Sequence, residues 1–129
     1  MNTSSRHPTS PHLQIYRLPL TALLSVTHRA TGVFLAIGSL LLIWVLAALA
    51  EGPEAYAQMQ PLLQSWIGQL ALLGITFSLY FHFCNGIRHL FWDVGMGFEL
   101  ETVDRTAKIV VVVSILLTAA TWIIAMGVE

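Results

Sequence analysis

Long apolar runs, interrupted at only a few points, dominate the pattern of this chain. A membrane-spanning helix needs about 20 apolar residues. Three stretches free of Asp, Glu, Lys and Arg are long enough: 30–50, 55–87 and 109–128. The pattern predicts an all-α fold, a bundle of three transmembrane helices at about residues 20–50, 61–92 and 106–128.

Proline and glycine residues mark where these helices begin and break. Pro19 fits a helix start, where its missing N–H costs nothing, and Gly52-Pro53 breaks the first helix. The three glutamines that follow suggest an interfacial segment on the outer side, before a second span that Pro61 is expected to begin. Residues 1–20 hold three prolines and lack the apolar core of a signal peptide, so we expect the first span to stay in the membrane.

Composition and charge indicate a membrane protein and orient it. Of the 129 residues, 56% are hydrophobic and only 10% are charged, against about 25% charged in a soluble domain. Three basic residues precede or open the first span and three flank the connection 93–108: Arg6, Arg17, Arg29, Arg88, Arg105 and Lys108. By the positive-inside rule, the N-terminus and this connection are cytoplasmic. We therefore expect a cytoplasmic arm over residues 1–19 and a membrane anchor over residues 20–129.

Polar residues, histidines among them, form a matching stripe on each of the first two expected helices. At about 100° per residue, the stripe on the second helix comprises His82, Gly86, His89 and Asp93. The stripe on the first helix comprises Ser25, His28, Arg29 and Gly32. Both stripes lie toward the cytoplasmic ends, so they can converge there. Ionisable side chains inside a membrane are costly and usually functional, and imidazole is a common ligand of haem iron.

The depths of the histidines predict how a haem would stand. His82 lies about 10 Å deeper than His89 at 1.5 Å per residue. This offset suits an upright porphyrin with its iron at His82 and its propionates near His28, Arg29 and His89. The single cysteine, Cys84, excludes the CxxCH attachment of a c-type haem, so the haem would be a non-covalent b-type haem.

A six-coordinate haem needs a second ligand. His28 could supply it within one chain, but it is expected near the membrane surface, beside Arg29 and above the depth of His82. A partner chain is the simpler source. A self-contained di-haem cytochrome needs four ligands, and only His28, His82 and His89 are available in or near the lipid.

Each of these side chains also has a structural interpretation. His82 could simply hydrogen-bond to a neighbouring helix, and Arg88 is more simply an interfacial anchor. Asp93 either pairs with Arg88 at a helix end or has a functional role. Ser25 could bond to its own helix, and Arg29 could reach lipid headgroups. A small transporter should carry a coupling carboxylate inside a span, and these spans contain none; a haem-free structural adaptor stays open.

At these positions the chain resembles the cytochrome b556 (large membrane-anchor) subunits of succinate dehydrogenase. Two motifs carry the resemblance: Ser25-Val-Thr-His28-Arg29-Ala-Thr31-Gly32, and His82-x-x-x-Gly86-Ile-Arg88-His89-Leu-x-Trp92-Asp93-x-Gly95. The arm segment Ser10-Pro11-His12-Leu13-Gln14-Ile15-Tyr16 is also similar to the family's. One departure is His7-Pro8, where members usually have Arg-Pro, and this puts the contacts of the arm in doubt.

The resemblance implies a place in a larger complex. The chain would anchor a flavoprotein and an iron–sulfur subunit to the bacterial inner membrane, or to the mitochondrial inner membrane if eukaryotic. One haem b would be shared with a second small membrane subunit, with His82 as this chain's axial ligand and His28, Arg29 and His89 near the propionates. Ser25 and Arg29 match the family's ubiquinone pocket, with Asp93 as a possible neighbour. The chain would not be an enzyme by itself, and an anchor of a related quinol:fumarate reductase is the alternative.

Overall fold

The computed structural model describes residues 17–128, which form four helices. Three of them, α1 (Leu20–Glu51), α3 (Trp66–Asp93) and α4 (Leu100–Gly127), are long and apolar enough to cross a membrane. The fourth, α2 (Pro53–Gln64), has only 12 residues and is too short to span. No strand occurs in the described residues, so the predicted all-α fold with three spans is confirmed. The expected contacts of the arm fall on residues 1–16, outside this range.

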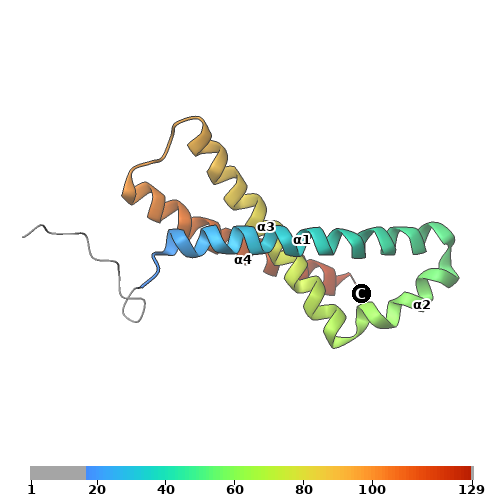
Figure 1. Cartoon of the computed structure of the whole chain (residues 1–129). Helices are drawn as coiled ribbons and strands as arrows, with labels where there is room; N and C mark the ends of the chain where they lie inside the picture. Colours follow the sequence, from blue (N-terminus) through green and yellow to red (C-terminus); the bar gives the residue numbers. More distant parts are fainter. Residues whose placement is uncertain (1–16, 129) are drawn as a thin grey trace, which may run out of the picture.

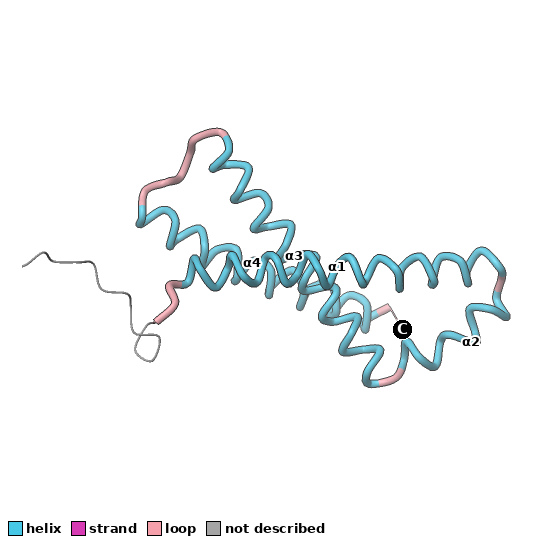
Figure 2. Tube along the Cα trace, in the orientation of Figure 1, coloured by secondary structure: helices cyan, strands magenta, loops and turns pink. Residues whose placement is uncertain are grey.

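The central helix of the bundle is α3, which packs against both α1 and α4. In Figure 1 the α3–α4 loop lies at the same end as the start of α1, and the α1–α2 junction lies at the opposite end. Figure 2 shows how little of the described chain is loop. The start of α1 and the α3–α4 connection, near which the basic residues lie, are therefore on the same side of the bundle, as the charge pattern predicted.

The second span begins at Trp66 and not at Pro61, which lies inside α2. The break comes at Ser65, whose side chain accepts a hydrogen bond from the Gly68 N–H at 3.1 Å and so caps α3. Gly68 also lies where a Cβ would collide with the backbone carbonyls of Leu62 and Leu63. A cap followed by a residue without a side chain sets this boundary, and the proline does not.

The third long helix begins at Leu100, about six residues before the expected start. Its first two turns carry charged side chains, so the apolar run marks only the part of α4 inside the lipid. These turns are helical because their inner face packs on α3: Ala107 is fully buried, and Val103 and Thr106 accept hydrogen bonds from Arg88. Hydropathy locates a span, but a helix can extend beyond it.

A small core near the cytoplasmic ends holds the three long helices together. It comprises Leu24 of α1, Phe81 of α3, and Ala107 and Val110 of α4. Small side chains let α3 and α4 approach closely, which is typical of helix contacts in membranes. Most of the large apolar side chains are exposed along all three long helices. Such a surface needs lipid or other membrane subunits around it.

Candidate functional site

The two polar stripes meet between α1 and α3, at the cytoplasmic half of the bundle. The imidazole rings of His28 and His82 stack with centroids 3.9 Å apart and planes 10° from parallel. His28 also contacts His89, with ring centroids 5.3 Å apart. Three histidines from two helices therefore form one cluster, as the stripes predicted.

The orientation of His82 is set by contacts from α1. Its Nδ1 lies 3.2 Å from the backbone carbonyl oxygen of His28 and 3.3 Å from Thr31 Oγ1. Its Cε1 faces Gly32, where an added Cβ would stand only 3.1 Å away. Only Nδ1 makes hydrogen bonds within residues 17–128, which leaves Nε2 as the nitrogen available to a metal. The donor set thus suits a histidine ligand of haem iron, which commonly has its other nitrogen bonded to a carbonyl.

The ring of His28 lies directly against that of His82, a contact that the sequence did not predict. Two axial imidazoles approach an iron from opposite faces of a porphyrin, with their nitrogens directed at the metal. Rings stacked face to face at 3.9 Å leave no room for a macrocycle between them. In this arrangement His28 and His82 do not bind the same iron, and a second ligand from a partner chain stays a prediction.

One atom of the cluster lacks a partner. His28 Nδ1 is buried and makes no hydrogen bond within the described part of the chain. A missing bond of this kind costs about 1–3 kcal/mol. A buried polar atom without a partner calls for an explanation, and a functional role of the imidazole would provide one.

The cluster continues along α3 toward the α3–α4 loop. The ring of Trp92 meets that of His89 edge-on, with centroids 5.0 Å apart. Its indole Nε1 donates a hydrogen bond to the Gly97 carbonyl at 3.2 Å, and Phe98 stacks on it at 6.4 Å. Trp92 therefore ties the loop to the end of α3 that carries the histidines.

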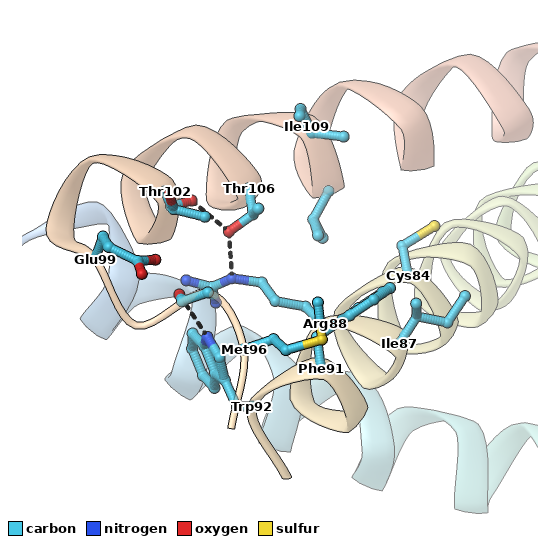
Figure 3. Close-up of a pocket in the computed structure, with 12 residues that line it drawn as sticks. Cys84, Ile87, Arg88, Phe91, Trp92, Met96, Glu99, Thr102, Thr106 and Ile109 are labelled. Atoms are coloured by element: carbon cyan, nitrogen blue, oxygen red, sulfur yellow. Dashed lines mark hydrogen bonds between the residues drawn. The ribbon is translucent and has the colours of Figure 1, made fainter. Parts of the chain in front are cut away.

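Arg88 is buried, with 6% of its surface exposed, and so is not the interfacial anchor that the sequence favoured. Its Nε donates to Thr106 Oγ1 at 3.0 Å and its Nη2 donates to the Val103 carbonyl at 3.0 Å. Its guanidinium carbon lies 4.1 Å from the centre of the Trp92 ring. Figure 3 shows this side chain extending from α3 toward α4. Asp93 is exposed, and Arg88 points to α4 and not to it.

A groove of about 480 Å³ lies beside Arg88 between α3 and α4 (Figure 3). Its walls are mainly apolar and include Cys84, Ile87 and Ile109. The stacked histidines are not among its lining residues. Trp92, whose ring contacts His89, does line the groove, so the groove adjoins the histidine cluster.

The remaining predicted residues lie on the surface of the chain. Ser25 and Arg29 are exposed on α1, one turn apart, and Asp93 is exposed at the end of α3. Within residues 17–128, no hydrogen bond joins these three side chains. The structure brings the histidines together, whereas the expected quinone-site residues stand on an open face.

Two residues that contribute to the site were given no role in it from the sequence, although both stand in the recognised motifs. Thr31 follows His28 by three residues and so shares its helix face, which is the signal that could have identified it. Arg88 carries a local signal as well, because Trp92 lies one turn later at cation–π spacing. Its partners on α4 lie 15 and 18 residues away and have no readable pattern.

Comparison with known proteins gives one result for nearly the whole chain. Residues 3–121 match the model of a family described as succinate dehydrogenase/fumarate reductase transmembrane subunit. The succinate dehydrogenase cytochrome b556 subunits of Rickettsia felis and Paracoccus denitrificans are 42% and 39% identical to it. These alignments cover 92% and 91% of this chain, and 93% and 90% of the relatives. The succinate dehydrogenase cytochrome b560 subunit of Reclinomonas americana is 36% identical over 96% of this chain and 90% of its own.

Proposed function

The chain belongs to the succinate dehydrogenase/fumarate reductase transmembrane subunit family, and from this premise we propose how it serves its complex. It is a membrane-anchor subunit of succinate dehydrogenase, a multi-pass protein of the inner membrane, and not the catalytic flavoprotein. We propose that it binds one haem b through His82, shares that haem with a second small membrane subunit, and forms part of the ubiquinone-reduction site.

The ligand role of His82 rests on one observation. Its Nδ1 is engaged by the His28 carbonyl and by Thr31, while Nε2 has no hydrogen bond within residues 17–128. A bound haem b would supply a one-electron redox centre. Around it, His89, Arg29 and the His28 ring would supply donors and positive charge for the propionates.

The second axial ligand would come from another membrane subunit. The stacking of the His28 ring on that of His82 supports this proposal, because it leaves no space for a porphyrin between the two rings. The exposed apolar faces of the long helices offer ample surface for a partner in the membrane. Flavoprotein and iron–sulfur subunits, which follow from membership of succinate dehydrogenase, would dock at the cytoplasmic end.

Ser25 and Arg29 would contribute to the ubiquinone site. A quinone carbonyl oxygen accepts hydrogen bonds, and a hydroxyl beside a guanidinium supplies donors with a positive charge. Both side chains are exposed one turn apart at the cytoplasmic end of α1, where a quinone in the lipid and an iron–sulfur subunit can both reach. Asp93, exposed at the same end of the bundle, would be a neighbour of this site.

The family description also includes fumarate reductases, which run the reverse reaction. The three relatives reported above all carry the succinate dehydrogenase name. Succinate oxidation with ubiquinone reduction is therefore the proposed direction.

Haem content after substitution of the ligand tests the proposal. His82→Leu in the purified complex should leave the subunits assembled and remove the haem b. The haem is measured as pyridine haemochrome and expressed as a ratio to the flavin content of the complex. Phe83→Leu is the matched control, because Phe83 is adjacent and exposed, and it should keep the haem. Full haem content in His82→Leu would reject the ligand assignment.

A further inference from the structure

We propose that Thr31 is a positioning residue for His82: with the His28 carbonyl, it holds the imidazole as the Nδ1–H tautomer and leaves Nε2 to bind iron. This inference deepens the proposed function and rests on His82 being the haem ligand. Thr31 lies on α1 and His82 on α3, so the ligand would be oriented by the neighbouring helix.

The position of one proton follows from the hydrogen bonds of Thr31. Its hydroxyl donates to the His28 carbonyl oxygen at 2.9 Å. A hydroxyl has one hydrogen, so toward His82 the Thr31 oxygen can only accept. The contact of 3.3 Å between Thr31 Oγ1 and His82 Nδ1 then requires a hydrogen on Nδ1.

The second contact leads to the same tautomer independently. The His28 carbonyl oxygen, 3.2 Å from His82 Nδ1, has lone pairs and no hydrogen. An unprotonated Nδ1 would direct its own lone pair at that oxygen. Both neighbours of Nδ1 are therefore acceptors, and the neutral ring carries its proton there, which leaves the Nε2 lone pair free.

The surroundings restrict the ring as well as its proton. The His28 ring covers one face of the His82 imidazole at 3.9 Å. The Cε1 edge of the His82 ring packs against Gly32, and a Cβ at that position would lie only 3.1 Å from Cε1. Thr31 is itself buried, with 6% of its surface exposed. A buried hydroxyl that bridges a carbonyl and an imidazole fixes the rotation of the ring about the Cβ–Cγ bond.

These contacts give Thr31 a specific effect on a bound iron. A hydrogen bond from the far nitrogen raises the basicity of an imidazole ligand, and its direction sets the plane of the ring. Without the hydroxyl, Nδ1–H has only the His28 carbonyl as acceptor, and the ring is free to turn toward it. Loss of such a supporting bond commonly weakens metal binding by about 10–100-fold. Because the carbonyl remains, the lower end of that range is expected.

Low-temperature EPR of the oxidised complex, with haem retention after dilution, tests this role. Thr31→Val keeps the shape and removes the hydroxyl; it should move the low-spin haem signal and lower retention about 10-fold. Thr31→Ser restores the hydroxyl and should match the wild type in both readouts. Thr118→Val is the matched control, because Thr118 is a similarly buried threonine that bonds only within α4, and it should change neither.

The outcomes distinguish the role of Thr31 from the proposed role of His82 as the haem ligand. A wild-type EPR signal and retention in Thr31→Val, beside a haem-free His82→Leu, would overturn the role of Thr31 alone. Equal shifts in Thr31→Val and Thr31→Ser would also overturn it, because the hydroxyl would not be the cause. Haem retained in His82→Leu would overturn the ligand and the inference together. Should Thr31→Val fail to assemble, Thr31→Ala removes the same hydroxyl without added bulk and carries the same readouts.

Discussion

The guanidinium of Arg88 on α3 donates a hydrogen bond to Thr106 Oγ1 on α4 at 3.0 Å. A second bond from the same side chain reaches the Val103 carbonyl, also at 3.0 Å. Both acceptors lie in the turns of α4 that precede its apolar run. One planar side chain thus holds the cytoplasmic end of α4 against α3, close to the Trp92 ring.

Replacing Arg88 by lysine should loosen this end of the bundle. Lysine keeps the charge, but it lacks the planar fork that reaches two acceptors and stacks on Trp92. We expect a loss of about 1–3 kcal/mol, seen as a lower thermal denaturation temperature of the purified complex. Arg105→Lys is the control, since Arg105 is exposed on α4 and should tolerate the change. Equal stability of the two variants would show that the fork contributes nothing.

Gly32→Ala should disturb the haem ligand without breaking the fold. The new Cβ would stand 3.1 Å from His82 Cε1, and the ring must move by a few tenths of an ångström. We expect less haem per complex. Gly38→Ala makes a matched control on the same helix, because its Cβ would meet the flexible Ile75 side chain, also at 3.1 Å. Full haem content in Gly32→Ala would mean that α1 does not constrain the ring.

Much of the fold could be predicted because apolar length alone decides which segments cross a membrane. Helix ends were harder, since the cap at Ser65 and the polar first turns of α4 depend on local contacts and not on hydropathy. The histidine stripes could be read from helical periodicity. The stacking of His28 on His82 could not be predicted in this way. It depends on how α1 and α3 cross and on their relative shift along the helix axes, which no local sequence pattern encodes.

Tyr80→Phe should weaken the contact between the middle of α3 and the C-terminal part of α4. The Tyr80 hydroxyl lies 2.7 Å from Thr121 Oγ1, and Thr121 already donates to the Leu117 carbonyl, so Tyr80 is the donor. Hydrogen bonds between membrane helices are worth about 0.6 kcal/mol on average and up to about 1.7. A small drop in thermal stability of the complex in detergent should result. Thr76→Val, which removes a bond within α3 only, should have a smaller effect.

Ser25→Ala should weaken ubiquinone reduction while leaving the haem spectrum unchanged. Loss of one neutral hydrogen bond, worth about 0.5–1.5 kcal/mol, corresponds to a roughly 2–10-fold rise in the apparent KM for a short-chain ubiquinone. Ser39→Ala is the control, because Ser39 is an exposed serine farther along α1 that bonds only to its own helix. Unchanged kinetics in Ser25→Ala would exclude the hydroxyl from the quinone site.

One difference spectrum tests whether His82 presents Nε2 to a haem within the assembled complex. The native complex is purified in mild detergent, and its oxidised spectrum is subtracted from the spectrum after succinate is added. The difference spectrum should show the α-band of a low-spin b-type haem with two histidine ligands, and this band should be absent from His82→Leu. An intact complex that reduces ubiquinone and shows no haem band would contradict it.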